Sequence, residues 1–228
     1  MYIYDIHYFQ SVKMQPEKRP LVKKSSWYDP SSGRNFSAGG VLLYDDYDDE
    51  GFYLLGETRT KDDIMYNDIG GKYTIEDCTI WQTIRRELYE ETYGLVDVLV
   101  KDVVRWSTSY PLITIDAHGK DLKAFRLDKE PPVLPGTTYS YMCIVLPVSE
   151  IQRLTTLYEG KMLFTDEVNE ELYSQARAEA IAKRSPKMED RTPLCLKKIK
   201  YSEINHNDSL HGYRLKPLLP LLRELFPI

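Results

Sequence analysis

The 228-residue chain has the composition of an ordinary soluble domain, with 42% hydrophobic and 29% charged residues. These proportions exclude a disordered chain, a collagen-like repeat and a small scaffold built on disulfides. The formal net charge of −5 argues against general affinity for nucleic acid, which depends on neutralising phosphates, while leaving room for a local basic groove.

The cysteines and the apolar runs predict the cellular compartment of the protein. The three cysteines are widely spaced and form neither a C-x-x-C pair nor a zinc-like cluster, which favours a reducing compartment. Residues 1–5 lack the basic and apolar regions of a signal peptide, and the best apolar run, residues 141–148, is too short to span a membrane. We predict a cytoplasmic protein without membrane association; a nuclear location also fits.

Residues 1–37 predict an N-terminal extension. They are aromatic and polar, and they are interrupted by the proline-containing stretch 16–20 and by a turn at residues 29–33. We expect this extension to pack on the core or on a partner, and we expect residues 38–228 to form the main domain.

Regular structure becomes legible from residue 38. Residues 38–44 have the pattern of a strand, a polar turn follows, and residues 52–58 have the pattern of the returning strand of a hairpin. A loop then leads to the glycine pair Gly70-Gly71. Because glycine has no Cβ atom, this pair lets the backbone approach a ligand closely.

A helix is predicted directly after the glycine pair, over residues 79–93. Ile80, Ile84 and Leu88 recur at four-residue spacing, as expected for the buried stripe of an amphipathic helix. Gly94 is a plausible stop, since glycine readily adopts the left-handed conformation that ends many helices.

The second half of the chain predicts further strands, helices and one basic segment. Strands are expected over residues 95–106, 112–115, 124–127 and 139–146, and helical segments over residues 149–184 and 215–226. The two middle strands would form a hairpin around residues 118–120. Residues 177–200 carry eight basic side chains against three acids. Strands interleaved with helices predict an α/β sandwich with a mixed sheet, flanked by the N-terminal extension and by helical C-terminal additions.

The predicted helix at residues 79–93 also carries acids. On a helix, Glu87, Glu90 and Glu91 fall within one arc of about 100°. Like charges at this spacing destabilise a helix, and a divalent cation among them relieves the repulsion. Mg²⁺ takes hard oxygen ligands and keeps part of its coordination shell for phosphates. The plain alternative is a solvated acidic face beside Arg85 and Arg86.

The surrounding residues resemble the box of the Nudix hydrolase family, G-x5-E-x7-R-E-U-x-E-E-x-G-U, in which U is a bulky apolar residue. The matching residues are Gly71, then Arg86-Glu87-Leu88-Tyr89-Glu90-Glu91, then Gly94-Leu95. We call residues 71–95 the box. The resemblance implies an α/β/α sandwich with a mixed sheet and a hydrolase that acts on a diphosphate bond.

The box departs from the family pattern at two places. Counting from Gly71 puts the first acid at Asp77, whereas counting back from Arg86 puts it at Cys78, so one extra residue lies between the turn and the helix. Glu76 and Asp77 could both supply this acid. A second extra residue, Tyr93, precedes Gly94.

The resemblance also implies roles for individual residues. Glu90 and Glu91 would be the principal ligands of Mg²⁺ or Mn²⁺, and Glu87 would be a further ligand or the base that activates water. Arg86 would hold a carboxylate in place. The segment Gly70-Gly71-Lys72 would shape the metal and phosphate site. A further acid would come from downstream, and the candidates are Glu167, Glu170 and Glu171, for which a solvated helix face is the alternative.

Three functions follow as hypotheses. The first is a Mg²⁺-dependent hydrolase that cleaves the diphosphate bond of a nucleoside diphosphate linked to another group. The second uses the basic segment 177–200 to hold capped RNA or another polyphosphate ligand, although the net charge of the chain does not indicate RNA. The third is a nucleotide-binding module of the same fold without catalysis. The expected partner is a nucleotide-derived small molecule, and a homodimer is compatible with all three hypotheses.

Overall fold

The computed structural model describes residues 26–47, 51–60, 63–129, 133–154, 161–164, 168–183, 193–206 and 215–226. The strands are β1 (Trp27–Asp29), β2 (Arg34–Tyr44), β3 (Gly51–Thr60), β4 (Asp63–Asn67), β5 (Ile69–Lys72), β6 (Leu112–His118), β7 (Asp121–Arg126), β8 (Thr137–Pro147) and β9 (Cys195–Lys200). The helices are α1 (Ile80–Glu91), α2 (Val100–Ser109), α3 (Val148–Gln152), α4 (Glu170–Lys183), α5 (Tyr201–His206) and α6 (Leu215–Leu225), with 3-10 turns η2 (Ile75–Asp77) and η3 (Leu127–Lys129).

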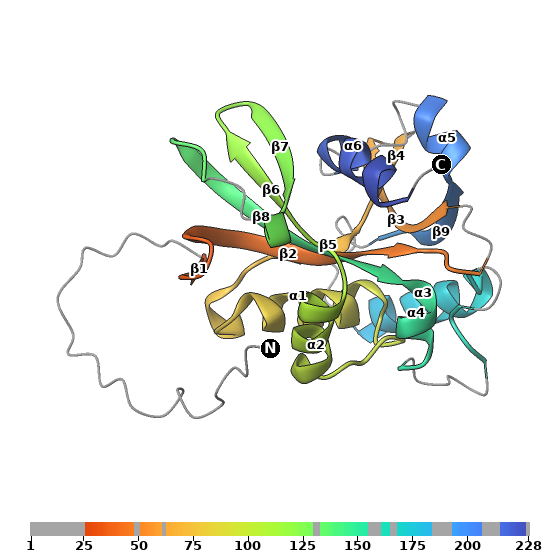
Figure 1. Cartoon of the computed structure of the whole chain (residues 1–228). Coiled ribbons are helices and arrows are strands. Elements are labelled where there is room, and N and C mark those ends of the chain that lie inside the picture. The colour runs from red at the N-terminus through yellow and green to blue at the C-terminus, as the bar shows by residue number, and fades with distance from the viewer. Residues whose placement is uncertain are drawn as a thin grey trace.

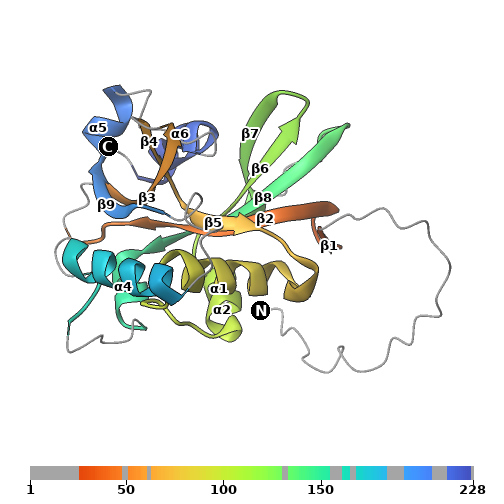
Figure 2. The same ribbon diagram turned by 180° about the vertical axis from the view of Figure 1, so that it is seen from behind.

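These elements form an α/β/α sandwich, as Figures 1 and 2 show from opposite sides. One mixed sheet lies in the middle, with α1, α2 and α4 on one face and α5 and α6 on the other. The predicted fold class, an α/β sandwich with a mixed sheet, is therefore confirmed. Among the described residues, no helix is long and apolar enough to cross a membrane.

The sheet has the strand order β4-β3-β2-β8-β6-β7. In addition, β1 and β5 pair with β2, and β9 pairs with β3. Strand β2 pairs in parallel with β8 along one edge. Its other edge pairs in succession with β1, β5 and β3, all antiparallel. In this register Gly39 lies opposite Gly71 and Gly40 lies opposite Gly70. The glycine pair of the box is thus part of the central sheet.

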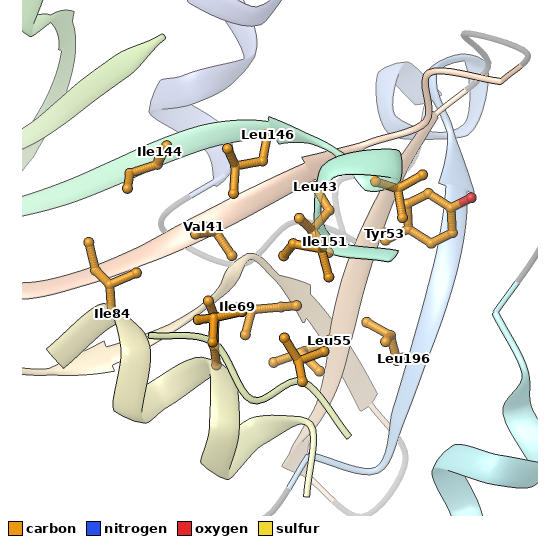
Figure 3. Packing of buried hydrophobic residues seen from close by; sticks show 14 of the residues in the cluster. Val41, Leu43, Tyr53, Leu55, Ile69, Ile84, Ile144, Leu146, Ile151 and Leu196 are labelled. Carbon is orange, nitrogen blue, oxygen red and sulfur yellow. The ribbon is translucent and has the colours of Figure 1, made fainter. Parts of the chain in front are cut away.

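Two apolar layers hold the sandwich together. On the face of α1, side chains of the sheet such as Val41, Leu55 and Ile144 pack with Ile84 of α1 and Ile151 of α3 (Figure 3). On the opposite face, the second layer lies beneath α5 and α6; its apolar members from these helices are Tyr201, Leu215, Leu218 and Leu222. Burial of apolar surface on both faces of the sheet supplies the main stabilising term.

A glycine in β2 lets α1 come close to the sheet. A Cβ atom on Gly39 would lie 3.0 Å from Cγ1 of Ile84 and 3.1 Å from Cδ1 of Ile80. Such a contact is tighter than ordinary packing, so a larger residue would push α1 away. The short distance between α1 and the sheet brings the acidic residues of the helix to the glycine pair of β5.

The strand predicted over residues 95–106 is wrong, because α2 begins at Val100. The carboxylate of Asp102 accepts a hydrogen bond from the Leu99 N–H at 3.0 Å, which caps the start of the helix. Val103 and Trp106, three residues apart, are the buried positions. That spacing is helical, and the apolar alternation that suggested a strand ends before it.

Most other predicted strands and helices are present, with bounds that differ by a few residues. The strand pairs 38–44 with 52–58 and 112–115 with 124–127 are confirmed, and so is the buried strand at 139–146. The helical stretch 149–184 contains α3 and α4, with an isolated bridge between Phe164 and Val168 in the interval. Strand β9 lies within the basic segment and was not predicted, because only Leu196 and Ile199 are buried in it.

The predicted N-terminal extension is described only from residue 26. Residues 26–37 contain β1 and the start of β2, so the predicted boundary at residue 37 falls inside a strand. The Trp27 ring lies 6.3 Å from the Phe36 ring and 6.1 Å from the Trp81 ring. Residues 1–25 lie outside the described part of the chain.

Candidate active site

Helix α1 is fixed at both ends by local hydrogen bonds. At its start, the Gln82 N–H donates to Oγ1 of Thr79 at 3.3 Å, and the Thr79 N–H donates to Oε1 of Gln82 at 3.2 Å. This reciprocal arrangement is a capping box. At its end, the Thr92 N–H donates to the Leu88 carbonyl, and Gly94 adopts a φ of 81°. The helix therefore presents its acids from a rigid element.

Arg86 is locked to Asp77 by two parallel hydrogen bonds. Its Nε lies 2.9 Å from Oδ1 and its Nη2 lies 3.0 Å from Oδ2 of Asp77. Asp77 is buried and also accepts hydrogen bonds from the Thr74 N–H and the Thr83 hydroxyl. Glu76 is exposed. Of the two acids that the sequence left open, Asp77 is the one that the geometry pairs with Arg86.

These contacts shift the pKa values of both partners. Burial opposes ionisation of Asp77, but the hydrogen bonds from Arg86, Thr74 and Thr83 prevail and lower the pKa of its carboxyl group. Burial likewise opposes the charge of Arg86, and Asp77 and Glu87 raise the pKa of its guanidinium. The pair is therefore fully charged at neutral pH.

The same guanidinium also faces the predicted metal ligands. Nη1 of Arg86 lies 2.7 Å from Oε1 of Glu87 and 3.0 Å from Oε2 of Glu90. Nη2 donates to the carbonyl oxygen of Lys72 at 2.7 Å. Two of the three carboxylates thus converge on one cationic group.

The two box glycines each contact one carboxylate. Glu87 is buried, and a Cβ atom on Gly71 would lie 2.3 Å from Cδ of Glu87. The Gly70 N–H donates to Oε2 of Glu91 at 2.7 Å. Glycine at position 71 is therefore required for the position of Glu87, and the backbone at position 70 holds Glu91.

The remaining predicted site residues lie around this centre or outside the description. The Lys72 side chain is exposed beside Gly71. Glu170 and Glu171 are exposed in the first turn of α4, and Glu171 lies 3.8 Å from the ammonium of Lys161. Glu167 lies outside the described residues. Contact between α4 and the box comes instead from Tyr173, whose hydroxyl donates to the Glu91 carbonyl at 2.8 Å.

The residues at the two departures of the box from the family pattern share a backbone feature. In the described part of the chain, the non-glycine residues with positive φ are Cys78, at 55°, and Tyr93, at 54°. They lie on either side of α1. Neither residue type favours this conformation, so no local signal in the sequence could have indicated it.

The acids of the box fit a divalent cation by their chemistry. Across the described residues, no group of three His, Cys, Asp or Glu side chains is already spaced to hold a metal ion. Glu87 and Glu90 nevertheless both contact one cationic group, because Nη1 of Arg86 lies within hydrogen-bond distance of each carboxylate. Carboxylate oxygens of this kind are the ligands that Mg²⁺ and Mn²⁺ prefer. The guanidinium therefore marks a place where the fold accommodates positive charge.

A hollow of about 480 Å³ opens beside Arg86, between η2, α1 and the start of α2. It is lined by Glu76, Asp77, Gln82, Arg85, Arg86, Leu99 and Val100. Arg85 is held at its edge by the Asp97 carboxylate at 2.6 Å and by the Val98 carbonyl at 3.1 Å. The hollow thus combines charged groups with the apolar start of α2.

Comparisons with known proteins give one likeness. No family model matches the sequence, and no curated protein matches it. Among solved structures, the chain is similar to a NUDIX hydrolase from Nitrosomonas europaea, with 13% sequence identity and a TM-score of 0.40 over 83% of this chain and 88% of that chain. At this identity and score the likeness decides nothing about activity, which has to be inferred from the box itself.

Proposed function

We propose that this protein is a Nudix-type hydrolase, dependent on Mg²⁺ or Mn²⁺, that cleaves the diphosphate bond of a nucleoside diphosphate linked to another group. Water adds to one phosphorus, and the bridging P–O bond breaks to give two phosphate esters. The observation that carries the proposal is the arrangement of Glu87, Glu90 and Glu91 along one edge of α1, next to the glycine pair of β5.

The chain's own residues have separate tasks in this proposal. Glu87, Glu90 and Glu91 would hold the metal, which when bound neutralises the diphosphate and activates water. Arg86 keeps the carboxylates of Glu87 and Glu90 together while Asp77 holds Arg86. The exposed ammonium of Lys72 is available to a phosphate oxygen beside the glycine pair.

The test compares the carboxylates of α1 with a carboxylate elsewhere. Glu90→Gln and Glu91→Gln should each lower turnover by about 100-fold, the upper range for perturbing a metal site. Glu203→Gln, an exposed change on α5 across the sheet, should leave turnover unchanged. Suitable substrates are ADP-ribose, nucleotide sugars, dinucleoside polyphosphates, capped RNA and diphosphoinositol phosphates. Full activity in both box variants would refute the assignment.

One observation favours a second candidate, a nucleotide-binding module without catalysis. Arg86 already contacts two of the three carboxylates that a metal would need. Such a module would bind nucleotide equally well with and without Mg²⁺ and would release no phosphate-containing product. Turnover of any substrate in the panel, lost in Glu90→Gln, excludes it.

The basic segment gives less support to an RNA ligand. Arg177 donates to the Pro193 carbonyl at 3.0 Å, and Lys198 pairs with the buried Asp45 carboxylate. Arg184, Lys187 and Arg191 lie outside the described residues. The hypothesis of capped RNA or another polyphosphate ligand stays a prediction, and a steep fall of substrate affinity with salt would support it.

A further inference from the structure

The last turn of α1 is attached to a distant part of the chain by two tyrosines. We propose that Tyr93 and Tyr173 are positioning residues that fix the turn carrying Glu90 and Glu91 to α4 and to the segment before β9. This inference rests on the proposed metal-dependent function, because it gives these tyrosines a role in placing metal ligands. Neither tyrosine is expected to touch the substrate.

Tyr173 caps the end of α1 from a position 82 residues away in the sequence. Its hydroxyl donates to the Glu91 carbonyl at 2.8 Å, and the side chain is buried. The last carbonyls of a helix have no partner within the helix, so an outside donor stabilises them.

Tyr93 joins the same turn to the segment before β9. Its hydroxyl donates to the Pro193 carbonyl at 2.6 Å, and Arg177 of α4 donates to the same oxygen at 3.0 Å. The Tyr93 and Tyr173 rings meet edge to face, with centroids 5.3 Å apart. These contacts hold Tyr93 in its left-handed conformation, which a non-glycine residue adopts only when its surroundings impose it.

Glu91 is consequently held at two points. Its side chain accepts from the Gly70 N–H of β5 at 2.7 Å, and its carbonyl accepts from Tyr173 of α4 at 2.8 Å. Removing the second point frees the backbone of the turn. The carboxylates of Glu90 and Glu91 keep their contacts with Arg86 and the Gly70 N–H but would then be carried by a less rigid backbone, whereas Glu87 stays packed against Gly71.

The experiment removes one hydroxyl group at a time. Tyr93→Phe and Tyr173→Phe keep the rings and delete the two donors. Tyr110→Phe is the matched control, because it deletes a phenol hydrogen bond of 3.1 Å to Glu150 on the side of α2 and α3. Three quantities are measured: the Kd of Mn²⁺ alone by electron paramagnetic resonance, hydrogen exchange of residues 88–95, and kcat and KM on the best substrate.

We expect Tyr173→Phe to weaken Mn²⁺ binding about tenfold, the lower range for losing a group that orients metal ligands. Exchange of residues 88–95 should become faster in both variants, and kcat should fall while KM holds. Tyr110→Phe should lower stability and leave Mn²⁺ binding and this exchange at the wild-type values. A merely structural role would give the Tyr110→Phe result in all three variants.

The outcomes separate this inference from the proposed function. Wild-type Mn²⁺ affinity in both variants, with unchanged exchange of residues 88–95, would overturn the positioning role and leave the hydrolase proposal standing. A wild-type protein that binds no Mn²⁺ would overturn both, even if exchange is faster in the variants, because there would be no metal site to position. Faster exchange together with weaker Mn²⁺ binding supports the inference.

Discussion

The polar networks around Arg86 and around Glu150 use the same chemical groups in opposite proportions. In the box, one guanidinium contacts three carboxylates, those of Asp77, Glu87 and Glu90. Between α2 and α3, one carboxylate receives four donors: the guanidiniums of Arg105 and Arg153, the Trp106 indole N–H and the Tyr110 hydroxyl. The first network has an excess of acid and the second has an excess of donors.

The difference separates a structural network from a candidate site. Glu150 accepts hydrogen bonds from four side chains, two of them cationic, so it ties α2 to α3 and has no surplus negative charge. Around Arg86 the acids outnumber the cation, and the positions of Glu87 and Glu91 depend on backbone at Gly71 and Gly70. Surplus negative charge on a rigid helix is the condition under which a bound cation stabilises a fold.

The largest expected effect comes from Gly71→Ala, which would break the box side of this comparison. The new Cβ atom would meet the Glu87 carboxylate at 2.3 to 2.4 Å, so either Glu87 or the strand must move. We expect turnover to fall about 100-fold, as displacements of about 1 Å do, and stability to fall by about 1–3 kcal/mol. Activity assays and urea unfolding measure the two effects. Wild-type activity would show that the position of Glu87 is unimportant.

Glu150→Gln tests the other side of the comparison. Although burial opposes ionisation, the hydrogen bonds from Arg105, Trp106 and Tyr110 lower the pKa of Glu150 to about 2, from an ordinary value of 4.5. A lowering of the pKa by this amount on folding means that the charged carboxylate stabilises the protein by about 3 kcal/mol at neutral pH. Glu150→Gln should remove about this much without changing turnover per folded molecule. Glu90→Gln is the control, because its exposed carboxylate should change stability by less than about 0.5 kcal/mol.

The pH dependence of the same variant sharpens the test. Since the folded-state pKa lies below the unfolded one, the stabilisation by Glu150 is fully present above about pH 5. It should be lost as the pH falls from about 4.5 to about 2. The unfolding free energies of the wild type and Glu150→Gln should therefore converge toward pH 2. A constant difference between pH 7 and pH 2 would contradict the assigned pKa.

The smallest expected effect is that of Cys78→Gly, in the loop that places Asp77 beside Arg86. Cys78 is exposed and has a φ of 55°, which is more strained for a residue with a side chain than for glycine. Relief of this strain exceeds the larger chain entropy of glycine, so stability should rise by up to about 1 kcal/mol. Cys78→Ala, which keeps a Cβ atom, should not raise it. Equal unfolding midpoints for the two variants would show that the loop is unstrained.

The sequence predicted helix α1 better than it predicted the sheet. Helix α1 was predictable because its apolar period, its acids and its glycine stop all lie within one short segment. Strand β9 was not, because Leu196 and Ile199 face opposite layers and the four other residues leave no alternation. The contact of Tyr173 with Glu91 depends on tertiary packing, which leaves no local signal. The choice of Asp77 over Glu76 depends instead on contacts with neighbours in the sequence, Thr74, Thr83 and Arg86.

The pairing of β3 with β9 has a consequence for synthesis of the chain. Strand β3 is made early, yet residues Gly51–Gly56 pair with Lys200–Cys195, which are made much later. Until those residues leave the ribosome, this stretch of an apolar strand has an open edge. Open edges are templates for pairing between molecules, and growing chains are exposed to it while they wait. Strand β9 therefore covers this edge, and the nascent chain acquires that protection from aggregation only after residues 195–200 have been made.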